Sequence, residues 1–313
     1  MTLARAGLLM GLAALALAAA PSPAAATAED GGQAVAWTRL ALGARSASLG
    51  QAVSALDDDA FAAAQNPALL AAQHQINLAT QAALLTDGRT LGYLGLARPV
   101  DASSDWGWGG SWSYYADTTP YERRSGNTAV PDGTFGANAS LVQGGLGAWA
   151  WGRSLALGAD FKLYSQALDS ANANGAGFDA GAYGRPADWV DLALVLQDLG
   201  SHVGWSTGKS ESLPTRLRLA ARLKALQGRA ALSVESWAEA DQGPHLGVGL
   251  EWWALPDSLA FRAGWQDGQV ALGLGGQGRF WGTLTRLDYS AGTDLSATDQ
   301  LQQRVSLTFG FDL

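Results

Sequence analysis

From about Ile76 to the C-terminus, the chain divides into short segments in which apolar side chains alternate with polar or small ones. The segment from His245 to Ala254 is the clearest, because Leu246, Val248, Leu250 and Trp252 alternate with Gly247, Gly249 and Glu251. A period of two is that of a β-strand, and roughly ten residues is the length that a tilted strand needs to cross a bilayer. We count fourteen such segments, at 76–83, 90–99, 105–116, 141–151, 154–168, 176–185, 190–200, 213–224, 229–238, 245–254, 257–266, 269–280, 282–291 and 302–313.

The N-terminus has the organisation of a secretory signal peptide. Arg5 supplies a positive charge, residues 6–20 are apolar, and small residues at 24–28 fit a cleavage site. The apolar run is shorter than a membrane-spanning helix, which makes an uncleaved anchor the weaker alternative. We therefore expect residues 1–28 to be removed on export. The sequence contains no cysteine, so neither a lipoprotein anchor nor a disulfide is expected.

Composition narrows the fold class further. Charged residues make up 15% of the chain and hydrophobic residues 48%, whereas about a quarter of an average soluble protein is charged. After residue 28, no apolar run is long enough for a transmembrane helix. These features leave a soluble β-rich protein or a membrane barrel whose apolar surface is spread over alternating strands. The net charge of −8 argues against nucleic acid as a partner.

The connections between the segments favour the barrel over a β-sandwich. Some are short, as at 254–257 and 227–228, whereas 117–133 and 201–212 are long and polar. Short turns at one rim and long loops at the other are typical of outer-membrane barrels. We predict an all-β membrane protein, an antiparallel transmembrane β-barrel of about 14 strands over residues 75–313, in a bacterial outer membrane.

Residues 29–74 lack the alternation and are rich in Ala, Asp and Gln. Asp58 or Asp59 could cap a short helix through residues 61–64, with solvated charge, and Asn66-Pro67 marks a break after it. A metal site at 57–59 is the weaker alternative, since consecutive side chains point in different directions. A segment of this kind before a barrel is expected to fold back into the lumen as a plug.

The same segment resembles a known family. The stretches 42–52 (LGARSASLGQA), 57–60 (DDDA) and 65–69 (QNPAL) are similar to the N-terminal signature of the PorV/PorQ family, within the FadL-like group of outer-membrane barrels. Weaker similarities follow at 178–181, 194–200, 213–219 and 304–311. The chain departs from the family at Gln65, where an aromatic residue is usual, and at its end, Phe311-Asp312-Leu313. The resemblance implies that the plug motif consists of Gly43, Arg45, Gly50, Asp58, Asn66, Pro67 and Ala68.

The resemblance also implies two possible functions. PorV-like proteins assist protein secretion to the cell surface through the type IX system, which would make secretion components or secreted proteins the partners. FadL-like proteins take up fatty acids or other hydrophobic small molecules. We expect one of these roles for a non-enzymatic barrel surrounded by outer-membrane lipid, with no cofactor. A barrel-embedded lipid hydrolase is a weaker alternative, because His74, His202 and His245 lie on three separate segments without a catalytic spacing.

Charged side chains recur on the strand face opposite the apolar one. They include Lys162, Arg216, Arg218, Arg222, Glu235, Glu251, Arg262 and Arg286. Charges that face lipid cost about 2–4 kcal/mol near the midplane, so these side chains are expected to face the lumen. They could line a translocation path or bind an anionic head group, but accompanying acids favour a paired ladder that holds the plug.

One pair of segments predicts a specific register. If Pro256-Asp257 forms a two-residue turn, the residue numbers of each directly opposed pair add up to 513. Trp252 then faces Phe261 on the lipid side, and Glu251 faces Arg262 on the lumen side. A slip of one residue would put both charges against hydrocarbon, so the apolar face should fix this register.

Overall fold

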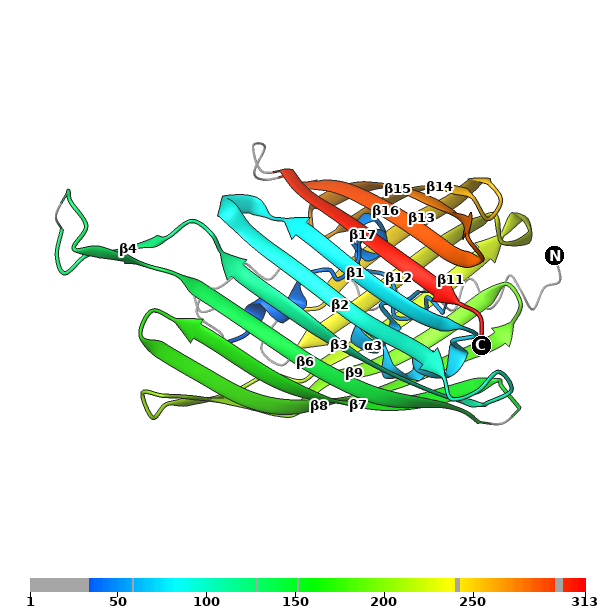
Figure 1. The fold of residues 1–313 in the computed structure, drawn as a ribbon, viewed down its shortest axis with the longest axis horizontal. Helices are drawn as coiled ribbons and strands as arrows, with labels where there is room; N and C mark the ends of the chain where they lie inside the picture. The colour runs from blue at the N-terminus through cyan, green and yellow to red at the C-terminus, as the bar shows by residue number, and fades with distance from the viewer. Residues whose placement is uncertain (1–33, 58, 128, 151, 240–242, 296–300) are drawn as a thin grey trace.

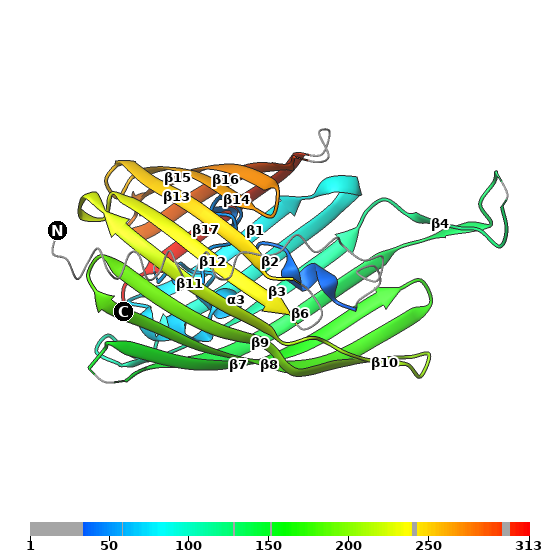
Figure 2. The same cartoon turned by 180° about the vertical axis from the view of Figure 1, so that it is seen from behind.

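The computed structural model describes residues 34–313 except 58, 128, 151, 240–242 and 296–300; the predicted signal peptide therefore lies outside the described residues. The described chain forms one closed antiparallel β-barrel with a helical segment inside it (Figures 1 and 2). Its fourteen long strands are β1 (Ile76–Leu84), β2 (Arg89–Pro99), β3 (Trp106–Asp117), β6 (Ala137–Ala150), β7 (Leu155–Leu168), β8 (Ala171–Ala187), β9 (Val190–Trp205), β11 (Arg216–Ala225), β12 (Ala230–Glu239), β13 (His245–Leu255), β14 (Leu259–Gln266), β15 (Gln269–Phe280), β16 (Thr283–Asp294) and β17 (Leu301–Phe311).

Each long strand pairs with its neighbours in sequence, and β1 pairs with β17 to close the barrel. The fourteen strands predicted from alternation are all confirmed, with ends that differ by a few residues. The connections differ more. The predicted polar loop 117–133 contains β4 (Tyr121–Arg123), which pairs with β5 (Gly133–Phe135), and the loop at 201–212 is largely taken up by β9 and β10 (Ser210–Ser212). In both of these connections, antiparallel strand pairing therefore continues beyond the rim of the barrel.

The two ends of the barrel are different. One end, which we call the turn end, carries the β2–β3, β6–β7, β8–β9, β11–β12, β13–β14 and β15–β16 connections, all of six residues or fewer. The opposite end, the loop end, carries the β4–β5 hairpin, which projects well past the rim (Figure 1). The C-terminus lies at the turn end (Figure 1). Short turns are periplasmic in outer-membrane barrels, so the loop end is the extracellular one.

The strand faces separate by polarity as predicted. Large apolar side chains on the outer surface are 37–69% exposed across the barrel, among them Leu94, Val142, Leu146, Leu163, Phe178, Leu194, Leu250, Phe261, Leu272, Leu274 and Leu287. The charged side chains that alternate with them are buried. This continuous apolar surface matches the hydrocarbon of a bilayer.

The predicted register of β13 and β14 is confirmed. Glu251 is opposite Arg262 and Trp252 is opposite Phe261, and the two rings stack with centroids 6.1 Å apart. The predicted two-residue turn was wrong, because the register shifts between Trp253 and Leu255, and Leu255 pairs with Leu259. Asp257 in the turn adopts a left-handed conformation with φ 53°. One extra residue in the hairpin is therefore absorbed at the rim without disturbing the transmembrane pairs.

Inside the barrel, residues 34–74 form what we call the luminal segment (Figure 2). It contains the 3-10 helix η1 (Ala36–Arg39), the α-helices α2 (Ala44–Ser48) and α3 (Ala62–Gln65), and the 3-10 helix η2 (Pro67–Ala72); η3 (Thr86–Gly88) and η4 (Leu226–Gly228) are single turns between strands. The helix after Asp59 begins one residue later than predicted, and α3 ends directly before Asn66-Pro67. No helix among the described residues is long and apolar enough to span a membrane.

Candidate channel and its luminal segment

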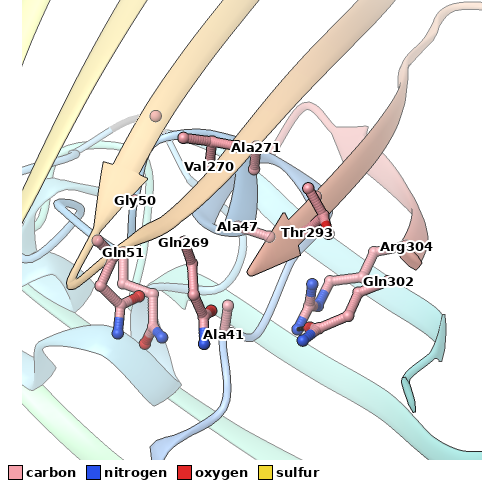
Figure 3. Close-up of a pocket in the computed structure, with 13 residues that line it drawn as sticks. Ala41, Ala47, Gly50, Gln51, Gln269, Val270, Ala271, Thr293, Gln302 and Arg304 are labelled. Carbon is pink, nitrogen blue, oxygen red and sulfur yellow. Dashed lines mark hydrogen bonds between the residues drawn. The ribbon is translucent and has the colours of Figure 1, made fainter. Parts of the chain in front are cut away.

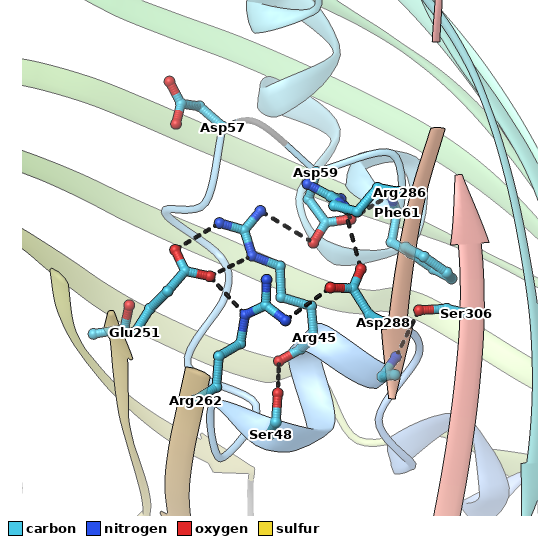
Figure 4. A network of polar contacts seen from close by, with 12 residues as sticks. Arg45, Ser48, Asp57, Asp59, Phe61, Glu251, Arg262, Arg286, Asp288 and Ser306 are labelled. Carbon is cyan, nitrogen blue, oxygen red and sulfur yellow. Dashed lines mark hydrogen bonds and ion pairs between the residues drawn. The ribbon is translucent and has the colours of Figure 1, made fainter. Parts of the chain in front are cut away.

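An ionic network joins the luminal segment to the barrel wall (Figure 4). Arg45 of α2 donates from Nε and Nη2 to the two carboxylate oxygens of Glu251, each over 2.8 Å. Arg222 and Arg262 of the wall also reach Glu251, each over 2.7 Å. Arg45 and Glu251 are 1% and 0% exposed. One carboxylate on β13 therefore receives three guanidinium groups, and only that of Arg45 comes from the luminal segment.

A second part of the network holds the residues just before α3. Arg262 donates to Asp288 over 2.7 Å, and Arg286 lies 3.2 Å from Asp288 and 3.6 Å from Asp59. Asp59 is 1% exposed and accepts from the backbone N–H of Phe61, which corrects the prediction of a solvated acidic cap. Its charge is balanced by buried arginines rather than by water. Asp58 lies outside the described residues.

Closer to the loop end, the loop after α2 is tied to β11 and β12. Glu235, which is fully buried, accepts from the backbone N–H of Ser54 over 2.9 Å and from its hydroxyl over 2.7 Å. Arg218 donates to Glu235 and to the carbonyl of Gln51. Wall charges thus satisfy backbone groups that a lumen-filling loop would otherwise leave without hydrogen bonds.

The Asn66-Pro67-Ala68 motif is fixed by its own hydrogen bonds. The Asn66 side chain accepts from the N–H of Ala68 over 3.0 Å, which caps η2, and donates to the carbonyl of Ser54 over 2.9 Å. Glycines of the wall allow the motif to approach closely. A methyl group at Gly158 would lie 2.3 Å from the Pro67 carbonyl carbon, and one at Gly181 would lie 2.0 Å from Asn66 Oδ1.

Gly50 provides a second close approach. Its φ is +60°, and a side chain there would lie 2.3 Å from the carbonyl oxygen of Trp265 on β14. The backbone N–H of Gly43, where φ is +91°, donates to the side chain of Gln81. Both positions therefore need glycine for conformation, and Gly50 also needs it for space.

Not every inward charge contacts the luminal segment. Lys162 lies 2.7 Å from Asp179 and 2.9 Å from Asp198, in a wall cluster of β7, β8 and β9. Arg216 pairs with Glu239 over 2.6 Å, and Glu239 also pairs with Arg39 of η1. The structure thus brings most of the predicted luminal charges together around α2 and its loops, and leaves Lys162 apart.

An apolar cluster in the loop-end half of the lumen was not predicted. Trp37 of η1 is 8% exposed and packs among side chains of the barrel wall. These side chains come from β1–β3, from β6–β9 and from the residues just before β11. The buried ones are Ala83, Leu91, Ala139, Leu141, Tyr164, Ala173, Val203 and Leu213. We call this the Trp37 cluster. Its ring stacks on Tyr115 at a centroid distance of 6.0 Å. The available signal was Leu141-Val142, two adjacent apolar residues in a strand, of which Leu141 faces inward at 4% exposed and Val142 outward at 49%.

Cavities lie on either side of the network. A cavity of about 280 Å³ near the turn end is lined by polar groups, including those of Asp57, Gln73, His74, Asn77 and Arg286. Two smaller ones lie near the loop end. The first, of about 150 Å³, is lined by residues that include Arg39, Arg216, Trp237, His245 and Asp267. The second, of about 40 Å³, lies beside Gln51 and Arg304 (Figure 3). Residues of the luminal segment line all three cavities.

No protein-family model and no curated protein sequence matches the chain. Among solved structures, a FadL homologue from Pseudomonas aeruginosa is similar over 86% of this chain and 98% of that one, with a TM-score of 0.56 and 12% identity. A mutant of TodX, described as a monoaromatic hydrocarbon channel, is similar over 87% and 99%, with a TM-score of 0.57 and 11% identity. These likenesses establish the fold. With the apolar outer surface, they place the chain among bacterial outer-membrane β-barrels.

Proposed function

We propose that this protein is an outer-membrane channel for small hydrophobic molecules and that the luminal segment is its plug. The observation that carries the proposal is the Trp37 cluster, an apolar site in the loop-end half of the lumen where the luminal segment packs on the wall. A purely structural filling of the lumen would need no apolar surface near the extracellular rim. A passenger of the size of an indole ring would find the environment that Trp37 now occupies.

The remaining contacts give the plug motif and the luminal charges their roles in this proposal. Gly43 and Gly50 let the chain turn and approach the wall, and Asn66, Pro67 and Ala68 anchor the return of the segment toward β1. Arg45 and Glu251 hold α2 across the lumen. The fold likeness to TodX supports a hydrophobic passenger over other cargo, because that protein is described as a hydrocarbon channel.

A role in protein secretion is the second candidate, and the β4–β5 hairpin favours it. The hairpin projects past the rim (Figure 1), and Tyr121 and Arg123 on it are exposed. An exposed hairpin outside the cell could contact a secreted protein or a secretion component. Deleting residues 121–135 distinguishes the candidates, because an uptake channel would keep its transport rate and a secretion accessory would lose surface display of its cargo.

We expect Leu141→Asn to lower uptake of a labelled monoaromatic hydrocarbon by at least about fivefold. The substitution places an amide in the Trp37 cluster, and burial of an amide without a hydrogen bond costs on the order of 1–3 kcal/mol. The measurement is the initial rate of uptake by cells that express the protein and lack other hydrocarbon channels.

Val142→Asn is the matched control, because Val142 is the next residue on the same strand and faces outward. It should leave the rate per folded barrel unchanged. Equal rates for Leu141→Asn and the wild type, with equal amounts of heat-modifiable barrel on gels, would argue against the apolar site as part of the path.

A further inference from the structure

Arg304 on β17 is a buried cation for which the described part of the chain provides no carboxylate partner. It is 7% exposed. Among the described residues its one hydrogen bond runs from Nη2 to the side-chain oxygen of Gln302, over 3.0 Å, and its buried Nε has no partner. Other inward arginines of the wall, such as Arg216 and Arg262, each contact an acid within 2.8 Å. Burial of a guanidinium without a counter-charge is costly, so the exception calls for a ligand.

Arg304 borders a small cavity with a polar lining. Four amide side chains surround the space, those of Gln51, Gln266, Gln269 and Gln302. Figure 3 shows the polar ends of Gln51, Gln269, Gln302 and Arg304 turned toward the same space. The cavity volume is about 40 Å³. One water molecule needs on the order of 10–15 Å³ of such space, so the cavity suits a group of about three heavy atoms.

We propose that Arg304 and the surrounding glutamine amides bind a small oxyanion, such as a carboxylate or phosphate group, at the extracellular end of the lumen. The planar guanidinium offers paired N–H donors that match the two oxygens of such a group. Amide N–H groups supply further donors and leave the net charge of the site positive. The site is separate from the Trp37 cluster, so it does not depend on the proposed channel function.

The electrostatic surroundings favour an anion over a cation. In the adjoining cavity, Arg39 and Arg216 share the single carboxylate of Glu239, and Asp267 is engaged by His245 over 2.8 Å. The nearby acids are therefore already paired, and the field at Arg304 stays positive. A site walled by protein concentrates such a field and attracts counter-ions.

The test uses the full-length protein in detergent micelles at constant ionic strength, with acetate as the probe and chloride as the balancing salt. Saturation-transfer NMR should show saturable acetate binding to the wild type. Arg304→Gln should weaken it at least about tenfold, because a hydrogen bond to a charged group contributes roughly 1.5–3 kcal/mol. Arg304→Lys keeps the positive charge but loses the paired N–H donors of the guanidinium, so it should weaken acetate binding less.

Arg279→Gln is the control, since Arg279 is an exposed arginine near the turn end that already pairs with Asp312. It should bind acetate like the wild type. Competition by inorganic phosphate would identify a general oxyanion site, and failure of phosphate to compete would assign the site to carboxylates. The absence of saturable binding, or equal binding by the wild type and both Arg304 variants, would overturn the proposal.

Discussion

Deleting residues 34–72 should leave a barrel that still inserts but conducts ions much better than the intact protein. The wall strands pair with one another without help from the luminal segment, because each long strand has two strand neighbours. The segment instead occupies the lumen through α2 and η2. Without it, the lumen becomes a continuous aqueous space, and we expect single-channel conductance in planar bilayers to rise on the order of tenfold or more.

Deletion of residues 121–135 is the control for this experiment. The β4–β5 hairpin lies outside the barrel (Figure 1), so its loss should not change the conductance. Heat-dependent migration on gels verifies that each variant is a folded barrel. A folded variant without residues 34–72 that conducts no better than the wild type would mean that the segment does not close the pore.

Glu251→Gln should be among the most destabilising single substitutions in the chain. The carboxylate of Glu251 lies between Arg45, Arg222 and Arg262, and all four side chains are buried. An amide would leave Arg45 beside Asp59, Arg262 beside Asp288, and Arg222 with the hydroxyl of Ser233. Removal of one partner from a buried ion pair costs about 3–5 kcal/mol, and we expect a loss in this range.

The measurement is equilibrium unfolding by guanidinium chloride in lipid vesicles, followed by tryptophan fluorescence. Glu122→Gln is the matched control, since Glu122 pairs with Arg124 on the exposed hairpin, where such pairs contribute about 0–1 kcal/mol. If Glu251→Gln unfolded at the same denaturant concentration as Glu122→Gln, the network would have no part in holding the structure together.

Alternation along the chain predicted the barrel because the bilayer leaves few choices. A strand that crosses hydrocarbon must present apolar side chains outward at every second position, so the period, the length and the lumen-facing charges all appear in the sequence. The pairing of Glu251 with Arg262 followed from the same constraint. The third partner, Arg45, could not be derived this way, because it lies 206 residues away on a segment without periodicity.

Other features escaped prediction because they depend on tertiary contacts. Asp59 was predicted to be a solvated helix cap. Its burial is explained by ion pairs with Arg45 of α2 and Arg286 of β16. The extra residue near Ala254 is a local adjustment of the β13–β14 hairpin that alternation does not encode. The Trp37 cluster forms where inward-facing positions carry Leu and Val instead of charged residues. The sequence signal for it was the interrupted alternation at Leu141-Val142.

The most direct test of the account is a reversible lock on the luminal segment. Ala55 packs in one cluster with Ala193 and Ala220, which are opposed on β9 and β11, so we choose positions 55 and 220 for an engineered disulfide. The chain has no cysteine of its own, which makes the engineered bridge unambiguous. With the bridge oxidised, hydrocarbon uptake should fall to background, and a reducing agent should restore it, while Ala55→Cys alone should transport in both conditions. Uptake at the wild-type rate with the bridge fully oxidised would contradict the proposal that the luminal segment is the plug that controls the channel.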